Sequence, residues 1–217
     1  MQRFQSLLAF VTIGLGLALG SPAGAQEGAP EVVAFGDSLS AGYGVGPGES
    51  FPEQLQAALN AAGHPARVVN AGVSGDTTTG GLARLDWSVP ASAAVVIVEL
   101  GANDALRGVS PDVTRANLDA ILQKLKARPD TQVLLAGMLS PPNMGADYAA
   151  KFNPIYAELA QKHGVPLYPF FLDGVAGNGS LNQQDYMHPN AQGVAVIVTG
   201  ILPQVVEALG AAAKPKA

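Results

Sequence analysis

Apolar and polar positions along this chain follow two recurring patterns. Short, unbroken runs of apolar and β-branched residues are typical of strands that are buried on both faces of a parallel sheet. Longer segments with apolar residues at every third or fourth position are typical of helices that cover such a sheet. The two patterns alternate from residue 32 to residue 209. This alternation predicts an α/β domain.

The individual elements follow from the bounds of these segments. The expected strands are residues 32–35, 66–70, 93–100, 132–136 and 165–168. The expected helices are residues 52–62, 111–127, 146–163 and 190–209, with Pro154 and Pro203 inside the last two, where proline should kink or interrupt a helix. Segments 77–86 and 140–146 are expected to be loops. Together the elements predict a three-layer α/β/α sandwich around a mostly parallel sheet of five strands with right-handed crossovers.

The first residues have the pattern of an export signal. Arg3 precedes a mostly apolar stretch at 7–19, and the small residues Ala23 and Ala25 follow at the positions that a signal peptidase reads. An uncleaved membrane anchor is the alternative, but the apolar stretch is short for a span of the bilayer. We therefore expect a secretory signal peptide over residues 1–25. The mature bacterial protein would be periplasmic or secreted, with no stable membrane anchor.

Composition and charge favour a single domain that acts on a small molecule. The chain has 217 residues, of which 48% are hydrophobic, enough for one core. We expect one domain over residues 26–210, a loose tail over 211–217, and a monomer. The absence of cysteine excludes thiol nucleophiles, disulfides and thiolate metal sites. The net charge of −5, with no basic run before Lys214, argues against a nucleic-acid partner.

The candidate chemistry begins where the first apolar run ends. Gly36, Asp37 and Ser38 follow the first expected strand, and ligand sites of open parallel sheets lie beyond the carboxyl ends of the strands. A serine hydroxyl at that place becomes a nucleophile when a base activates it. Asp185 precedes His188 by three residues, so its carboxylate can orient the imidazole from the same short segment. Simple turns and helix caps are the structural alternatives for both segments.

Candidate oxyanion donors also follow expected strands. Gly75 lies after the second strand, and Asn103 lies after the third. An acyl-transfer enzyme needs several hydrogen-bond donors that converge on the developing oxyanion, and a glycine amide and an asparagine side chain provide them. Alone, each residue is a common turn or cap residue, but with Ser38 they share one edge of the sheet. Asp76 and Asp104 are interpreted as loop braces, because a carboxylate aimed at the oxyanion would oppose its charge.

These residues stand in the order of the sequence blocks of a known family. The chain resembles the SGNH (GDSL) hydrolase family in four blocks: Gly36-Asp37-Ser38-Leu39, Gly75, Gly101-Ala102-Asn103-Asp104 and Asp185-x-x-His188. Longer strings are similar to its bacterial group of thioesterase I, protease I, lysophospholipase and arylesterase. They include Ser74-Gly75-Asp76-Thr77-Thr78 and Glu99-Leu100-Gly101-Ala102-Asn103. The resemblance covers nearly the whole mature chain.

The resemblance carries implications for fold, activity and site. It implies a flavodoxin-like sheet of order 2-1-3-4-5, and activity on acyl esters and thioesters without a metal or other cofactor. It implies that Ser38 is the nucleophile and His188 the base, with Asp185 orienting the imidazole. It also implies an oxyanion hole made by the backbone N–H groups of Ser38 and Gly75 and the side chain of Asn103.

The resulting prediction is a serine esterase or thioesterase that forms an acyl-enzyme on Ser38. Its substrates would be small-molecule acyl esters: aryl esters, acyl thioesters and lysophospholipids. Two alternatives stay open: a carbohydrate (acetyl) esterase of the same superfamily, which the aromatic content of 6% disfavours, and an exported binding protein without catalysis. Asp37 adjoins the serine, and we expect it to hold the turn by accepting hydrogen bonds from nearby amides rather than to orient the histidine.

Overall fold

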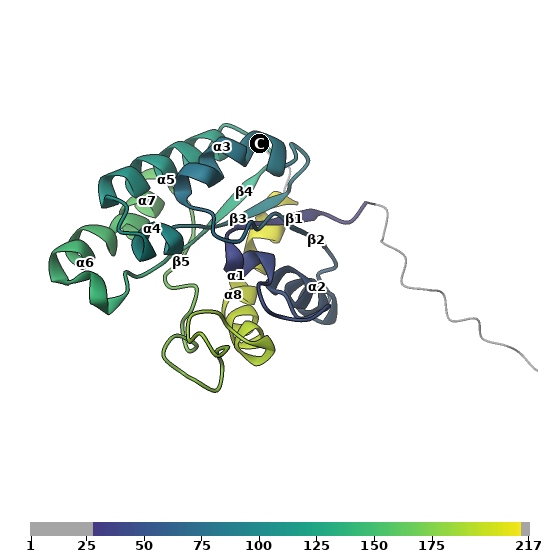
Figure 1. Cartoon of the computed structure of the whole chain (residues 1–217). Coiled ribbons are helices and arrows are strands. Elements are labelled where there is room, and N and C mark those ends of the chain that lie inside the picture. Colours follow the sequence, from purple (N-terminus) through teal and green to yellow (C-terminus); the bar gives the residue numbers. More distant parts are fainter. Residues whose placement is uncertain (1–27, 214–217) are drawn as a thin grey trace, which may run out of the picture.

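The computed structural model describes residues 28–213 as three layers, with a parallel sheet between two layers of helices (Figure 1). The expected signal peptide, residues 1–25, and most of the expected tail lie outside the described residues. The sheet contains β1 (Glu31–Gly36), β2 (Arg67–Asn70), β3 (Val95–Glu99), β4 (Gln132–Ala136) and β5 (Leu167–Tyr168). Its order is β2-β1-β3-β4-β5, and every pairing is parallel. The predicted fold class is confirmed.

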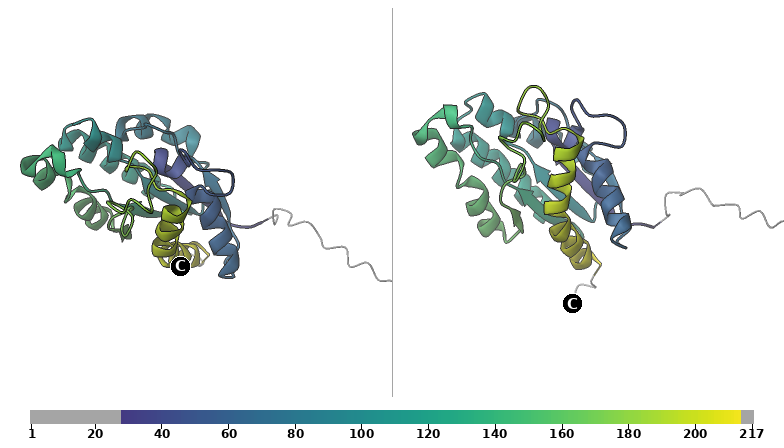
Figure 2. Two further views of the ribbon diagram at one scale, coloured as in Figure 1. Left: turned by 60° about the horizontal axis from the view of Figure 1, so that its bottom comes forward. Right: turned by 90° about the horizontal axis from the view of Figure 1, so that it is seen from below.

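Helices cover both faces of this sheet. They are α1 (Ser38–Ala41), α2 (Phe51–Ala61), α3 (Thr78–Ser88), α4 (Ala102–Leu106), α5 (Pro111–Lys126), α6 (Ala146–Phe152), α7 (Ile155–His163) and α8 (Ala191–Ala212), with a short 3-10 turn, η1 (Pro142–Met144). Figure 2 shows α2 and α8 lying side by side on one face, where they contact each other. On the other face α5 packs between α3 and α7.

The central strands β1 and β3 place the site. All residues of both strands are buried, which explains their unbroken apolar runs. Their register sets Gly36 beside Glu99, so the two strands end level with each other. Because the chain leaves β1 for β2 on one side and later returns to β3 on the other, this edge is the switch point where ligands bind in open sheets.

Some expected bounds were wrong. Segment 77–86, expected as a loop, is helix α3, whose buried residues are mostly polar or small and so hide the helical pattern. Helix α8 continues to Ala212, so the tail expected from residue 211 begins too early. The expected interruption at Pro154 is confirmed, because α6 ends at Phe152 and α7 begins at Ile155. Pro203 lies inside α8, which continues without a break, and the kink expected there stays a prediction.

Helix α8 is the one helix within residues 28–213 that is long and apolar enough to cross a membrane by composition alone. Its mean hydropathy reaches 1.8. However, Ile197, Ile201 and Val205 are buried, and the helix packs against α2, β3 and β4. Burial on the sheet therefore accounts for part of its apolar composition, since 39% of the apolar window is buried.

Candidate active site

The structure brings the predicted site residues to the carboxyl ends of the central strands. Ser38 begins α1 directly after β1, and Asn103 lies in α4 directly after β3. His188 arrives from the loop before α8. Its Nε2 lies 2.9 Å from the Ser38 Oγ, and its Nδ1 lies 2.6 Å from the Asp185 Oδ2. Serine, histidine and aspartate therefore form one continuous hydrogen-bonded chain.

The turn that carries the histidine is held by its own acid. Asp185 Oδ1 accepts hydrogen bonds from the backbone N–H groups of Met187 and His188, each at 3.0 Å. Tyr186, between Asp185 and Met187, has a positive φ of 58°, and it is the one non-glycine residue of the described chain with that conformation. The His188 backbone N–H is the main reason that the pKa of Asp185 is lowered to about 2, although partial burial opposes the shift. The carboxylate is thus ionised at neutral pH.

Two backbone N–H groups at the site are left without acceptors. Ser38 is the first residue of α1, where the helix itself offers its N–H no partner. Gly75 has a positive φ of 82°, and its carbonyl accepts a hydrogen bond of 2.7 Å from Arg107. Neither the Ser38 nor the Gly75 N–H donates to any atom of residues 28–213. Both remain available to a bound ligand.

Asn103 is the third expected donor, and its amide is already partly engaged. The Asn103 Nδ2 donates to the Asp37 Oδ2 at 3.0 Å. The other carboxylate oxygen of Asp37 accepts from the Leu39 N–H at 3.1 Å and caps α1. Asp37 thus bonds a nearby backbone amide, as expected, and in addition holds the amide of a candidate site residue, which the sequence did not indicate.

A second buried acid, Glu99, lies beneath the nucleophile and was missed from the sequence. It ends β3, is fully buried, and accepts hydrogen bonds from the Ser40 Oγ at 2.8 Å and the Asp37 N–H at 3.3 Å. Burial, followed by the nearby charge of Asp37, raises the pKa of Glu99 well above its usual value. Burial also raises the pKa of Asp37 to about 6, against its hydrogen bonds with Leu39 and Asn103. A lone glutamate at the end of an apolar run is the signal that could have found it.

Asp76 and Asp104 bond as the expected loop braces. Asp104 is buried and accepts hydrogen bonds from the backbone N–H and hydroxyl of Thr78. Asp76, next to Gly75, accepts from the Arg84 Nε at 2.6 Å. Arg84 also donates to the Gly36 carbonyl at 2.8 Å, so this buried arginine links the end of β1 to the loop that carries Gly75.

Apolar side chains occur in the segments that carry the polar centre. The Tyr43 ring lies 4.6 Å from the His188 ring, centroid to centroid. Val73, Leu106 and Met187 are large exposed hydrophobic residues in the segments that carry the site. An exposed apolar surface beside a nucleophile suits the hydrocarbon part of an ester.

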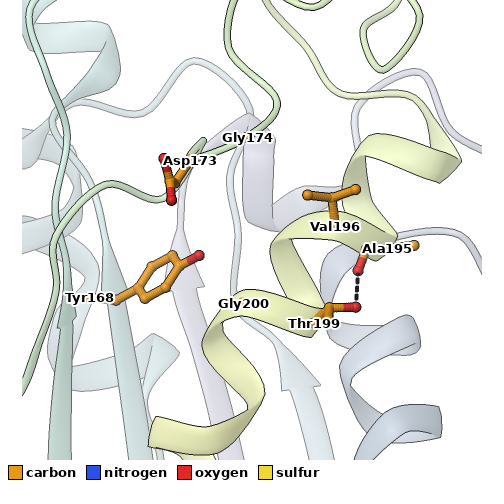
Figure 3. Close-up of a pocket in the computed structure, with 7 residues that line it drawn as sticks. All are labelled: Tyr168, Asp173, Gly174, Ala195, Val196, Thr199 and Gly200. Atoms are coloured by element: carbon orange, nitrogen blue, oxygen red, sulfur yellow. Dashed lines mark hydrogen bonds between the residues drawn. The ribbon is translucent and has the colours of Figure 1, made fainter.

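A separate cavity of about 420 Å³ lies between β5 and α8 (Figure 3). It is lined by Tyr168, Asp173, Gly174, Ala195, Val196, Thr199 and Gly200. None of these is a predicted site residue. Within residues 28–213 no group of three or more histidine, aspartate or glutamate side chains could hold a metal ion.

Comparisons with known proteins agree with one another. Residues 34–196 match the GDSL-like Lipase/Acylhydrolase family. The chain is 41% identical to esterase TesA of Pseudomonas aeruginosa over 76% of this chain and 82% of the relative. It is 36% identical to an arylesterase of Vibrio mimicus, over 85% and 92% of the two chains. It is 40% identical to thioesterase 1/protease 1/lysophospholipase L1 of Escherichia coli K12, over 75% and 76%.

Among solved structures, the fold is similar to that of AlinE4, an SGNH-hydrolase family esterase. The TM-score is 0.70 at 48% identity, and the match covers 83% of this chain and 97% of AlinE4. A structure of TesA superposes with a TM-score of 0.77 at 37% identity, covering 82% and 99% of the two chains.

Proposed function

The chain belongs to the GDSL-like lipase/acylhydrolase family and is a serine ester hydrolase, and from this premise we propose that it acts through an acyl-enzyme on Ser38. The observation that carries the proposal is the hydrogen-bonded chain from Asp185 through His188 to Ser38. The ionised Asp185 carboxylate can only accept a hydrogen bond, so Nδ1 of the imidazole carries the proton and donates to it. The lone pair of Nε2 therefore faces the serine hydroxyl, as a general base requires.

The reaction follows from this arrangement. The Ser38 Oγ attacks the carbonyl carbon of the ester while the His188 Nε2 takes the hydroxyl proton. The resulting imidazolium is stabilised by the ionised Asp185 and gives the proton to the leaving alkoxide, phenolate or thiolate. Water then attacks the acyl-enzyme with the same base, and Ser38 recovers its proton.

The developing oxyanion needs donors that are in place before the reaction. We assign this role to the backbone N–H groups of Ser38 and Gly75 and to the Asn103 side chain. Two observations support this assignment. Both backbone N–H groups lack an acceptor in the described chain, and Asn103 lies just beyond β3.

The proposed substrates are small acyl esters with an apolar part. Aryl esters, acyl thioesters and lysophospholipids are the classes that the names of the relatives suggest. The exposed Val73, Leu106 and Met187 support a hydrocarbon acyl or leaving group. A preference for acetylated polysaccharide over every aryl ester and thioester would favour the carbohydrate esterase alternative instead.

Mutation of the proposed triad tests this function. Ser38→Ala and His188→Ala should each abolish hydrolysis of a chromogenic aryl ester, and the double variant should be no worse than either, because triad members act as a unit. Ser92→Ala and His64→Ala are matched controls, since both residues are exposed and lie outside the site. Losses that multiply in the double variant would refute the assignment.

We further propose that residues 1–25 are cleaved during export and that the chain from residue 26 through the end of α8 acts as one monomeric domain in the periplasm or outside the cell. The charge, apolar stretch and small residues before residue 26 support export. Mass spectrometry of the protein from a periplasmic fraction should find Gln26 at the N-terminus. A full-length protein in the membrane fraction would contradict the proposal.

A further inference from the structure

Asp37 contacts a proposed oxyanion donor and not the proposed base. Its Oδ2 accepts from the Asn103 Nδ2 at 3.0 Å, and its Oδ1 accepts from the Leu39 N–H at 3.1 Å. The side chain is fully buried, so water does not compete for either oxygen. Both oxygens of this carboxylate are therefore used as acceptors, one for the helix cap and one for the asparagine.

An asparagine side chain has two ends that differ only in their hydrogen bonding. The amide can turn by about 180° and exchange its donor NH₂ for its acceptor oxygen with almost no change of shape. In one orientation Asn103 offers a second N–H to the oxyanion, whereas in the other it offers a carbonyl lone pair that repels it. Something must select the first orientation for Asn103 to assist catalysis.

We propose that Asp37 is a positioning residue that selects the donor orientation of Asn103. An ionised carboxylate has only acceptors, so it binds the NH₂ end and rejects the oxygen end of the amide. The second N–H of the same nitrogen then remains for the oxyanion. This inference rests on the oxyanion role proposed above for Asn103.

The surroundings keep Asp37 able to do this. Although burial raises the pKa of Asp37 to about 6, the carboxyl group is still ionised in an assay at pH 8. Glu99 accepts a hydrogen bond from the Asp37 N–H at 3.3 Å and fixes the backbone from below. Gly36 leaves room for that contact, because a Cβ there would come within 2.3 Å of the Glu99 Oε2. The acid is thus held between the nucleophile turn and the end of β3.

Two substitutions at Asp37 separate positioning from capping. Asp37→Asn is isosteric, but its single oxygen cannot satisfy both Leu39 and Asn103, and its NH₂ group would turn the Asn103 oxygen toward the oxyanion. Asp37→Ser keeps an oxygen that can cap α1 and removes the one that faces Asn103, so the amide is released without being turned. We expect kcat to fall by about a hundredfold in Asp37→Asn and by about tenfold in Asp37→Ser, with little change in KM, because the oxyanion exists only in the transition state.

The deciding measurement is a double-mutant cycle with Asn103→Ala on a soluble aryl ester at pH 8. If Asp37 acts through Asn103, Asp37→Asn should lower kcat no further in the Asn103→Ala background. Equal loss in both backgrounds would overturn the inference. If Asn103→Ala alone leaves kcat unchanged, the proposed oxyanion role fails first, which is a different result. Urea unfolding of each variant measures its folded fraction, and each kcat is expressed per folded molecule, so that a loss of stability is not counted as a loss of catalysis.

Discussion

The buried arginine of α3 allows a quantitative test of how the site is held. Arg84 donates hydrogen bonds to Asp76, to the Ala71 carbonyl and to the Gly36 carbonyl, at 2.6, 2.8 and 2.8 Å. Its guanidinium also lies 4.3 Å from the centre of the Phe35 ring. One side chain therefore joins the ends of β1 and β2 to the loop beside Gly75.

Arg84→Met keeps the apolar stem and removes these donors. The Asp76 side chain is only 13% exposed, so it becomes a buried carboxylate without a partner. Breaking a buried pair in this way costs about 3–5 kcal/mol of unfolding free energy. The Gly36 carbonyl adds little to this cost, because it also accepts a hydrogen bond from the Val73 N–H.

Urea unfolding followed by circular dichroism measures the loss. Arg115→Met is the matched control, because its pair with Glu158 is largely exposed and should be worth less than about 1 kcal/mol. Adding Asp76→Asn to Arg84→Met should restore part of the stability, because the unpaired charge is gone. A loss below about 1 kcal/mol, or a double variant less stable than Arg84→Met alone, would refute the reasoning.

Three further predictions concern the proposed triad, the buried glutamate of β3 and a mechanism without a metal. Asp185→Asn should lower kcat by up to about four orders of magnitude, because the imidazole adopts the wrong tautomer. Steady-state kinetics measures kcat, and an unchanged kcat would contradict the role of Asp185. The pKa of Glu99 is raised in the folded state, so the folded protein binds more protons than the unfolded protein. The folded protein therefore loses stability as pH rises above the pKa that Glu99 has in the unfolded chain. Glu99→Gln should therefore become more stable relative to the parent between pH 5 and pH 8 in urea unfolding, and a constant difference would contradict this. Activity should be unchanged in EDTA, and a loss that zinc or calcium restores would count against a metal-free mechanism.

The fold and the positions of the proposed site could be predicted where local pattern and burial agree. Strand β1 is buried on both faces, so its apolar run ends where the sheet ends, and Ser38 follows at once. The same reasoning places Gly75 and Asn103 after their strands. Asp185 and His188 are close in sequence, so their contact needs no knowledge of the tertiary structure.

The remaining features depend on partners far away in the sequence. Helix α3 has no clear apolar stripe, because Gly81 lets it approach Leu100 so closely that a Cβ would lie 2.4 Å from that side chain. In the sequence Glu99 is part of an apolar strand, and its partner Ser40, which donates a hydrogen bond to it, lies on another element. The contact between Asp37 and Asn103 likewise joins residues that follow two different strands, β1 and β3. Neither residue type indicates this contact in the sequence.

Labelling by an active-site phosphonate tests the central claim, that Ser38 is the nucleophile, most directly. The protein is incubated with a p-nitrophenyl alkylphosphonate, and residual esterase activity is compared with intact mass and peptide mapping over time. We expect one adduct per chain, located on Ser38, that rises in step with the loss of activity, and much slower labelling of His188→Ala. An adduct on another residue, or full activity after Ser38 is completely labelled, would contradict the account.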